Sequence, residues 1–439
     1  MQKINPTLFK KILRHPYALS MIAHLTAATV TGAACILFSY LFEWGLRHRG
    51  DPSHIGGWAF FVMPLGFLLS AELIRRSAPF ASGTGIPQAI FGAEYMTRQN
   101  EARLFPLVSP WTMTIKIVSL LIAVMAGAST GREGPTVHVA VCTFFFVLII
   151  FRRLLRVDFD PRSAIIAGAA AGLAAAFNTP LAGVTFAVEE LCENYFAPIK
   201  DIVLMSIIVA AVTAQILTGE YGYFGHLSEP VLLSMGGILT VSLASGGMGL
   251  FFGWILYQGG GYLRRFDRGH MRYGFPLLMG LSVGLLAAWA GVRTLGPGNM
   301  VAKQLLNGGF EPWVDGFAFA KMATTLMTYW AGLSGGIFAP CLSMGAAMGA
   351  NIAHAIGWPM ATCALIGMAA FLSGTIQAPM TSFVILYEMS GHHTMLLPLM
   401  LASLIPFILA RLLGIQPLYR LLASAYLPLF PELKNDQAN

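Results

Sequence analysis

An acidic side chain lies within an apolar stretch of this chain, in the run Gly131-Arg132-Glu133-Gly134-Pro135. The stretch extends from about Ile117 to Phe151, which places Arg132 and Glu133 at membrane depth. Charged residues at that depth are costly, and those that are kept usually line a water-filled or protein-lined pathway. Glu133 is therefore a candidate functional residue. The alternative is a loop that has kept one Arg-Glu pair without a function.

The glycines and the proline of this run interrupt the hydrophobic pattern. We expect one helix to end near Ser129 and another to begin near Glu133. Such a break is tolerated in lipid only where protein or a cavity covers the freed backbone groups. The amides at a helix start carry the positive end of the helix dipole, which suits an anion. An anion could therefore bind beside Glu133.

A second acidic motif, Val188-Glu189-Glu190-Leu191, follows a segment that is rich in glycine and alanine. The small residues allow close helix packing in lipid, which is the main role that we expect for the segment. At an exposed helix end the two carboxylates would be an ordinary solvated pair. Buried near an aqueous vestibule, one of them could carry protons. The residues alone leave both interpretations open.

The composition indicates a polytopic helical membrane protein. Hydrophobic residues make up 56% of the chain and charged residues only 11%, with a mean hydropathy of +0.68, which lies far outside the range of soluble domains. Some apolar stretches are shorter than the ~20 residues of a straight span and others are longer, so we expect broken and tilted helices. The stretches fall at about 17–46, 56–75, 112–130, 134–151, 163–191, 199–218, 231–258, 273–293, 317–333, 337–356, 361–375, 379–390 and 394–414.

The net charge of +7 fits basic cytoplasmic loops, such as Arg152-Arg153 and Arg264-Arg265. The basic residues form no pattern that indicates nucleic-acid binding. The basic start, from Lys3 to Arg14, indicates a retained cytoplasmic tail and not a signal peptide. The five cysteines lie in apolar segments at no metal-ligand spacing, so we expect small core residues and neither a metal site nor a cofactor.

Two further breaks resemble the one at Glu133 in construction. They are Ser82-Gly83-Thr84-Gly85-Ile86-Pro87 and Gly335-Gly336-Ile337-Phe338-Ala339-Pro340, and each puts glycine and proline at the junction of two apolar segments. Taken alone, the first of these would be interpreted as a short loop.

The break at Glu133 and the break from Gly335 to Pro340 belong to an internal repeat. At an offset of 205 residues the matching pairs are Lys116 and Lys321, Gly127 and Gly332, Ser129 and Ser334, Gly131 and Gly336, and Pro135 and Pro340. At an offset of 199 they are Gly168 and Gly367, Pro180 and Pro379, and Glu189 and Glu388. Interrupted helices in corresponding places of two half-repeats indicate a transport site near mid-membrane. We expect one transmembrane domain over residues 1–439, with half-repeats at about 17–218 and 231–414 and short cytoplasmic tails.

Three other polar residues in the apolar stretches have simple interpretations. Lys116 and Lys321 are expected to snorkel at helix starts, with the ammonium group in water. His138, three residues past Pro135, is expected to be a packed histidine and not a ligand.

Taken together, these residues resemble the CLC family of chloride channels and chloride/proton antiporters, over nearly the whole chain. The anion-site motifs of that family are written GSGIP, GREGP and GxFxP, with a tyrosine near the end of the chain. The corresponding runs here are Gly83-Thr84-Gly85-Ile86-Pro87, Gly131 to Pro135, Gly336-Ile337-Phe338-Ala339-Pro340, and Pro417-Leu418-Tyr419. The run from Gly172 to Gly183 is similar to the Gly/Ala-rich dimer-side segment of the family.

The resemblance implies an all-α fold of many tilted and broken helices in an inverted repeat. It also implies a homodimer with one anion pathway in each subunit. The amides of Ile337 and Phe338 and the hydroxyls of Thr84 and Tyr419 would then hold a partly dehydrated chloride ion. Arg132 would have a structural or electrostatic role. A further group of small residues would support the site: Gly83, Gly85, Pro87, Gly131, Gly134, Pro135, Gly336 and Pro340.

Glu133 corresponds to the gating glutamate of the family and Glu190 to its internal proton-transfer glutamate. The latter residue is typical of the antiporters, so the resemblance favours a chloride/proton antiporter, a secondary transporter and not an enzyme, in the inner membrane of a bacterial cell. Thr84 replaces the serine of the family motif, and its additional methyl group puts the preference for chloride over nitrate or fluoride in doubt.

Four other readings remain open at this point. A passive chloride channel would keep every anion motif, and a related exchanger would carry nitrate or fluoride. An intramembrane enzyme would use Glu133, Glu189, Glu190 and His138 as acid/base or metal groups, although the required spacings are missing. An organic-solute carrier would share the broken helices but would have a site less completely lined by backbone.

Overall fold

The computed structural model describes residues 16–49, 57–192, 196–219, 223–224, 230–263 and 269–434. The expected basic tail before Arg14 and the pair Arg264-Arg265 lie outside these ranges. Apart from two isolated bridges, every regular element of the described residues is helical. The all-α fold expected from the sequence is confirmed.

Most apolar stretches form one helix each. The longer helices are α2 (Pro16–Arg47), α3 (Gly57–Ser77), α6 (Pro110–Met125), α7 (Glu133–Leu155), α8 (Pro161–Phe177), α10 (Phe196–Thr218), α11 (Met235–Leu263), α12 (Met271–Ala290), α14 (Val314–Trp330), α15 (Phe338–Ile356), α16 (Met360–Ile376), α17 (Pro379–Ser390) and α18 (Leu396–Leu412). The shorter ones include α4 (Ile86–Tyr95), α5 (Glu101–Leu104), α9 (Pro180–Phe186), η4 (Ala187–Leu191), α13 (Asn299–Leu306) and α19 (Leu418–Ser424).

Local chemistry sets several of these boundaries. Proline occupies the first turn of α6, α8, α9 and α17, where its missing N–H group costs no helical hydrogen bond. Side chains cap two of these helices: the Ser109 hydroxyl accepts from the Thr112 amide, and the Asp160 carboxylate accepts from the Ser163 amide.

One expected boundary was wrong. Helix α6 ends at Met125 and not near Ser129, because Gly127 takes the left-handed backbone conformation (φ +94°) that stops a helix. The long stretch 163–191 is broken, as expected for its length, into α8, α9 and the turn η4, with Asn178 left-handed between α8 and α9 (φ +56°). The start of α7 at Glu133 is as expected.

The internal repeat is visible in the local structure. Helices α7 and α15 begin 205 residues apart, and α9 and α17 begin 199 residues apart. The backbone at their approaches matches as well. Gly127 and Gly332 share a positive φ, as do Asn178 and Gln377, which are two of the three non-glycine residues with positive φ in the described chain.

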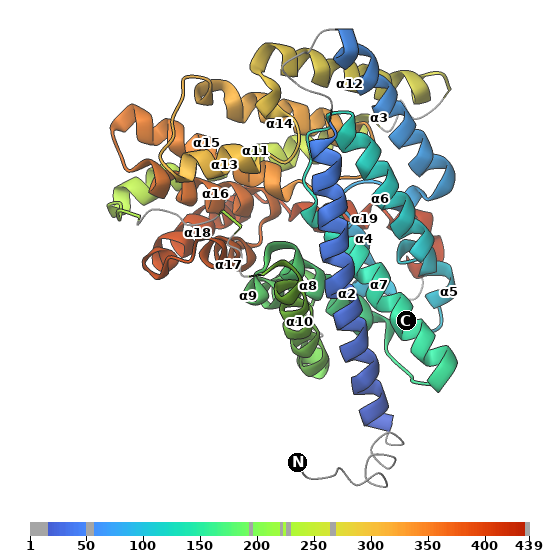
Figure 1. Cartoon of the computed structure of the whole chain (residues 1–439). Helices are drawn as coiled ribbons and strands as arrows, with labels where there is room; N and C mark the ends of the chain where they lie inside the picture. Colours follow the sequence, from blue (N-terminus) through green and yellow to red (C-terminus); the bar gives the residue numbers. More distant parts are fainter. Residues whose placement is uncertain are drawn as a thin grey trace.

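The two halves interlock. In Figure 1 the helices coloured blue to green gather around the long α2, whereas α15 to α18, in orange to red, form the other side of the molecule. Helix α3 packs against α12, and α9 packs against α17, so helices of the two halves are in direct contact. The helix starts that carry the sequence motifs lie between these halves.

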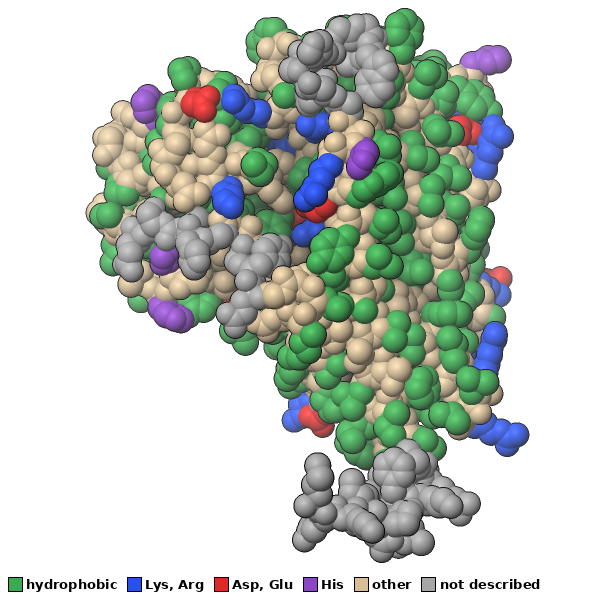
Figure 2. All heavy atoms as spheres, viewed as in Figure 1, with side chains coloured by type: hydrophobic (Ala, Val, Ile, Leu, Met, Phe, Trp, Pro, Cys, Tyr) green, Lys and Arg blue, Asp and Glu red, His purple; other side chains and the backbone are tan. Residues whose placement is uncertain are grey.

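The outer surface is suited to lipid. Seven segments of the described chain are long and apolar enough to cross a membrane. Figure 2 shows hydrophobic side chains over much of the face that α2 crosses, with few charged ones. This pattern agrees with the multi-pass membrane protein expected from composition.

Close glycine packing holds α8 inside the subunit. A Cβ atom on Gly172 would lie 2.3 Å from the Cβ of Ala140 on α7, and one on Gly168 would lie 2.9 Å from the Cβ of Phe144. The packing role expected for the Gly/Ala-rich segment is confirmed. Gly168 and Gly172 of α8 face α7, whereas Gly183 of α9 packs against Ala170 and Ala174 of α8. Leu181, just beyond α8, is exposed.

Candidate functional site

The three glycine-rich breaks meet through backbone hydrogen bonds. Gly131 and Gly336 exchange a pair, since the N–H of each donates to the carbonyl of the other at 2.8 Å. Gly83 donates to the Leu333 carbonyl at 3.0 Å and accepts from the Gly335 amide at 3.2 Å. These bonds satisfy backbone groups that a break in a helix would otherwise leave unpaired in an apolar environment.

Missing side chains let the breaks approach closely. A Cβ atom on Gly134 would lie 2.9 Å from the Cβ of Thr84, and one on Gly336 would lie 3.1 Å from the Gly134 nitrogen. A larger residue at either position would push the three motifs apart. The expected supporting glycines therefore act by bringing the start of α7 against Thr84 and the approach to α15.

Glu133 is the first residue of α7 and is fully buried. Its side chain folds back over Gly131, because a Cβ atom on Gly131 would lie 2.3 Å from Glu133 Oε2 and 3.0 Å from the Cβ of Ala339. Ala339 is the second residue of α15. The carboxylate thus lies next to the start of α15, in an environment that favours negative charge. Its other oxygen, Oε1, accepts a hydrogen bond from the Tyr223 hydroxyl at 2.9 Å.

The residues expected to coordinate an anion lie around the same region. Ile337 caps α15 and Phe338 begins it, and both are buried. The Tyr419 ring, near the start of α19, stacks on Phe338 with 6.1 Å between centroids and 19° between planes. The Thr84 hydroxyl accepts from the Ile86 amide at 3.3 Å, so its own proton can be donated.

Tyr419 has an uncommitted donor. Its side chain is 0% exposed, and its hydroxyl has no hydrogen-bond partner among the described residues. A buried donor without a partner costs stability, so such a group needs an explanation. A bound anion would supply the missing acceptor.

Lys116 and Lys321 correct an expectation. Both are 0% exposed, so neither snorkels to water. The Lys116 ammonium donates to the Gly83 carbonyl at 2.9 Å. The Lys321 ammonium donates to the Ser129 hydroxyl and the Thr294 carbonyl, each at 2.9 Å. The two lysines that the repeat relates therefore hydrogen-bond to the broken segments within the protein interior, where backbone carbonyls take the place of water as acceptors.

Glu190 lies in η4, a turn with the wide spacing of a π-helix, a feature that is frequent at functional sites. Its side chain is 4% exposed, whereas the adjacent Glu189 points to α17 and accepts from the amides of Met380 and Thr381 at 2.9 and 2.7 Å. The two carboxylates therefore have different environments. Glu189 caps a helix. Glu190 is buried, and the adjacent Leu191 belongs to the same apolar core as Phe338.

The repeat counterpart of Glu189 makes the reciprocal contact. Glu388 of α17 accepts from the amides of Leu181 and Ala182 at 3.0 and 2.8 Å, at the start of α9. Each half thus caps a helix of the other with a carboxylate, which satisfies amides that have no partner within their own helix.

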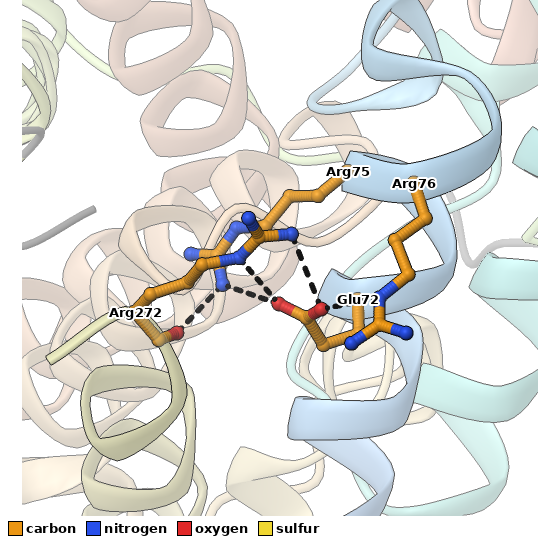
Figure 3. A network of polar contacts seen from close by, with 4 residues as sticks. All are labelled: Glu72, Arg75, Arg76 and Arg272. Atoms are coloured by element: carbon orange, nitrogen blue, oxygen red, sulfur yellow. Dashed lines mark hydrogen bonds and ion pairs between the residues drawn. The ribbon is translucent and has the colours of Figure 1, made fainter. Parts of the chain in front are cut away.

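A cavity of about 590 Å³ leads to the site and is lined by Gly83 and Thr84 together with Arg75 of α3. Beside it, Arg75, Arg76 and Arg272 surround the single carboxylate of Glu72, as Figure 3 shows. Arg75 also donates to the Arg272 carbonyl at 2.7 Å, which ties α3 to α12. Three guanidinium groups around one carboxylate leave excess positive charge near the cavity, and such charge attracts anions.

The remaining expected residues are located as follows. Arg132 is largely buried and precedes α7 as its cap residue. His138 is a packed histidine, as expected, because Nε2 lies 2.7 Å from the Leu107 carbonyl. The five cysteines are buried and form no disulfide. Gly85, Pro87, Pro135 and Pro340 all lie within or next to the first turns of α4, α7 and α15.

Sequence reasoning missed two residues of the site, Tyr223 and Asn299. The Asn299 amide donates to the Tyr223 hydroxyl at 2.7 Å, which in turn donates to Glu133. Tyr223 comes from a polar connection between the half-repeats, so neither periodicity nor the repeat could identify it. The adjacent aromatic pair Tyr223-Phe224 in that polar connection was the available signal.

Comparisons with known proteins identify the family of the chain. A family model described as "Voltage gated chloride channel" matches residues 66–411. The "H(+)/Cl(-) exchange transporter ClcA" of Salmonella agona is 30% identical over 427 residues, which cover 92% of this chain and 88% of that protein. The ClcA protein of Yersinia pestis is also 30% identical, over 91% of this chain and 86% of that protein.

A solved structure has the same fold. The crystal structure of "a slow cyanobacterial Cl-/H+ antiporter" superposes with a TM-score of 0.78 at 23% identity, and the match covers 93% of this chain and 98% of that chain. The fold, the broken helices that meet at Glu133 and the family match over most of the sequence lead to one conclusion. This chain is a multi-pass membrane protein that belongs to the CLC, or voltage gated chloride channel, family.

Proposed function

We propose that this protein is a secondary transporter that exchanges chloride for protons across the membrane. One observation carries the proposal: the Glu133 carboxylate lies at the converging starts of α7 and α15, where helix amides favour an anion. The names of the ClcA relatives give independent support, since they are chloride/proton exchange transporters. Because those relatives come from bacteria, a bacterial inner membrane is the proposed location.

Glu133 is the proposed gate. The ionised carboxylate and a chloride ion have the same charge and suit the same amide-lined position, so one displaces the other. Protonation removes the charge, so the helix amides attract the neutral side chain less strongly and it can leave the position. Anion movement and proton uptake are coupled because both require Glu133 to leave that position.

Thr84, Ile337, Phe338 and Tyr419 are the proposed anion-binding residues. The unpartnered hydroxyl of Tyr419 and the available proton of Thr84 suit a partly dehydrated anion, and the start of α15 adds two amides at Ile337 and Phe338. Thr84 keeps the hydroxyl donor of the family motif, and the relatives are named for chloride exchange, so we propose chloride as the preferred ion.

Glu190 is the proposed proton-transfer residue on the internal side. Its burial and its separation from the capping role of Glu189 support this assignment. A proton that crosses an apolar region needs an acid at each end, and Glu190 and Glu133 supply them. The working unit is proposed to be a homodimer in which each subunit contains its own pathway.

Flux from vesicles measured with chloride and pH electrodes together tests the proposal. An antiporter moves protons when only a chloride gradient is supplied. Chloride movement without coupled protons would replace the antiporter by a passive channel of the same fold. Failure to move chloride, with nitrate or fluoride moved instead, would overturn the proposed ion.

A further inference from the structure

A second tyrosine lies near the site, in the connection between α10 and α11. Tyr223 is half-buried, and Phe224 beside it is fully buried. The Tyr223 ring packs against Phe177 with 5.6 Å between centroids, and Phe177 packs against Phe338 at 5.8 Å. Because Tyr419 also stacks on Phe338, a continuous row of four rings connects the two tyrosines.

The polar end of Tyr223 is part of a directed hydrogen-bond chain. Asn299 Nδ2 lies 2.7 Å from the Tyr223 hydroxyl oxygen, and that oxygen lies 2.9 Å from Glu133 Oε1. An amide nitrogen can only donate, so the hydroxyl accepts from Asn299 and its single proton is directed to Glu133. Each bond in such a chain polarises the next and strengthens it.

This chain distinguishes the two protonation states of Glu133. A hydrogen bond to an ionised carboxylate is roughly twice as strong as one between neutral groups. Tyr223 therefore holds the charged form of Glu133 more firmly than the neutral form. Protonation weakens the contact at the step at which the side chain has to move.

We propose that Tyr223, held in place by Asn299, is a positioning residue that latches ionised Glu133 in the anion path and so limits the rate of exchange. The inference rests on the proposed function of Glu133 as the gate. The latch joins three parts of the molecule, since Glu133 begins α7, Asn299 begins α13, and Tyr223 belongs to the connection between the half-repeats.

Tyr223→Phe is the direct test, because it keeps the ring that packs on Phe177 and removes only the hydroxyl. Loss of a hydrogen bond to a charged group should raise chloride flux about three- to tenfold and lower the number of protons moved per chloride. Asn299→Leu should change both quantities in the same direction by less. Tyr40→Phe, on the lipid-facing side of α2, is the matched control and should behave as the unaltered protein.

The Glu133→Gln background separates a latch from a general structural effect. Glutamine cannot ionise, so adding Tyr223→Phe should leave the flux within about twofold of Glu133→Gln alone. If Tyr223→Phe alone does not raise chloride flux, or raises it equally in the unaltered and Glu133→Gln backgrounds, the latch is overturned. If the unaltered protein moves chloride and protons while Tyr223→Phe changes neither, the latch alone fails. If the unaltered protein moves no protons, the proposed function itself fails.

Discussion

Glu133 has the two properties that its proposed role requires. It brings a negative charge to the start of α15, and it can lose that charge by taking up a proton. Burial opposes the charged state, whereas two contacts favour it, because Tyr223 donates to the carboxylate and helix amides lie nearby. In the proposed mechanism, Glu133 is the group at which anion and proton compete, and the residues around it determine where its carboxylate lies.

Glu133→Gln should uncouple the two ions. Glutamine resembles the protonated gate in size but cannot release a proton, so we expect chloride flux to persist while chloride-driven proton movement falls to the background of empty vesicles. Parallel chloride and pH recordings check this result. Proton pumping by this variant would show that another group carries out the gating chemistry.

Glu190→Gln should also abolish proton movement while chloride still moves down its own gradient, because it removes an acid that takes no part in holding the anion. Glu189→Gln is the matched control from the adjacent position. It should retain proton coupling, because Glu189 caps α17 and carries no proton in this account. Full coupling in Glu190→Gln would mean that the relay is assigned to the wrong carboxylate.

At this scale the sequence identified residues whose type is unusual at membrane depth and missed those whose type is common in loops. Glu133 and Glu190 are visible because unused charge in an apolar stretch is costly. Tyr223 and Asn299 are not visible, because their importance comes only from the contact that the fold creates. The two buried lysines were wrongly expected to reach water, since their carbonyl partners come from distant breaks.

At the scale of the elements, glycine makes the site possible by letting helix starts touch. Gly131 is the clearest case, because Glu133 Oε2 occupies the space that a side chain there would need. The pairing of Gly131 with Gly336 then holds the starts of α7 and α15 together. The position of the proposed gate, Glu133, is set by contact between backbone segments, and not by a long side-chain network.

Gly131→Ala should displace the Glu133 side chain from the start of α15 while leaving the backbone pair with Gly336 intact. We expect proton coupling to fall at least about threefold, because even a modest geometric shift at a reacting group is costly. The proton-to-chloride ratio measures this effect. Gly316→Ala, in α14 at a position with open space around it, is the control for a general effect of replacing glycine. Unchanged coupling in Gly131→Ala would contradict the proposed packing.

The sequence predicts most of the long helices well and the short ones poorly. Helices α4, α13 and α19 did not appear as apolar stretches, because they have at most ten residues and an apolar window of that length is not distinctive. Their positions follow from tertiary packing. The breaks at Glu133 and Phe338 could be predicted, because glycine and proline leave a local signal that lipid makes informative.

At the scale of the whole molecule, the inverted repeat explains why the site lies between the halves. Glu189 caps α17 and Glu388 caps α9, so each half completes a helix start of the other. The connection is symmetric, although only the first half has a second carboxylate beside its cap. Glu190 therefore has no acidic counterpart, since Met389 follows Glu388. If Glu190 carries the proton as proposed, this asymmetry gives the proton one route on a scaffold of two similar halves.

Glu388→Gln should destabilise the contact between the halves. The loss of a charged cap costs about 0.5–2 kcal/mol, so we expect a lower midpoint of thermal unfolding in detergent. Proton coupling should survive at a temperature where the variant is folded. Glu94→Gln, at an exposed position of α4, is the control. An unfolding midpoint equal to that of the unaltered protein would show that the reciprocal caps add no stability.

The central claim, exchange of chloride for protons, is tested most directly by supplying a chloride gradient alone. Vesicles that contain the protein are loaded with high chloride, placed in low chloride at equal pH, and followed with a pH electrode. Chloride efflux should drive protons into the vesicles, against the proton gradient that develops, and Glu133→Gln should abolish the uptake. Through a passive channel, chloride efflux leaves the interior positive and repels protons. Chloride efflux without proton uptake would therefore contradict the account.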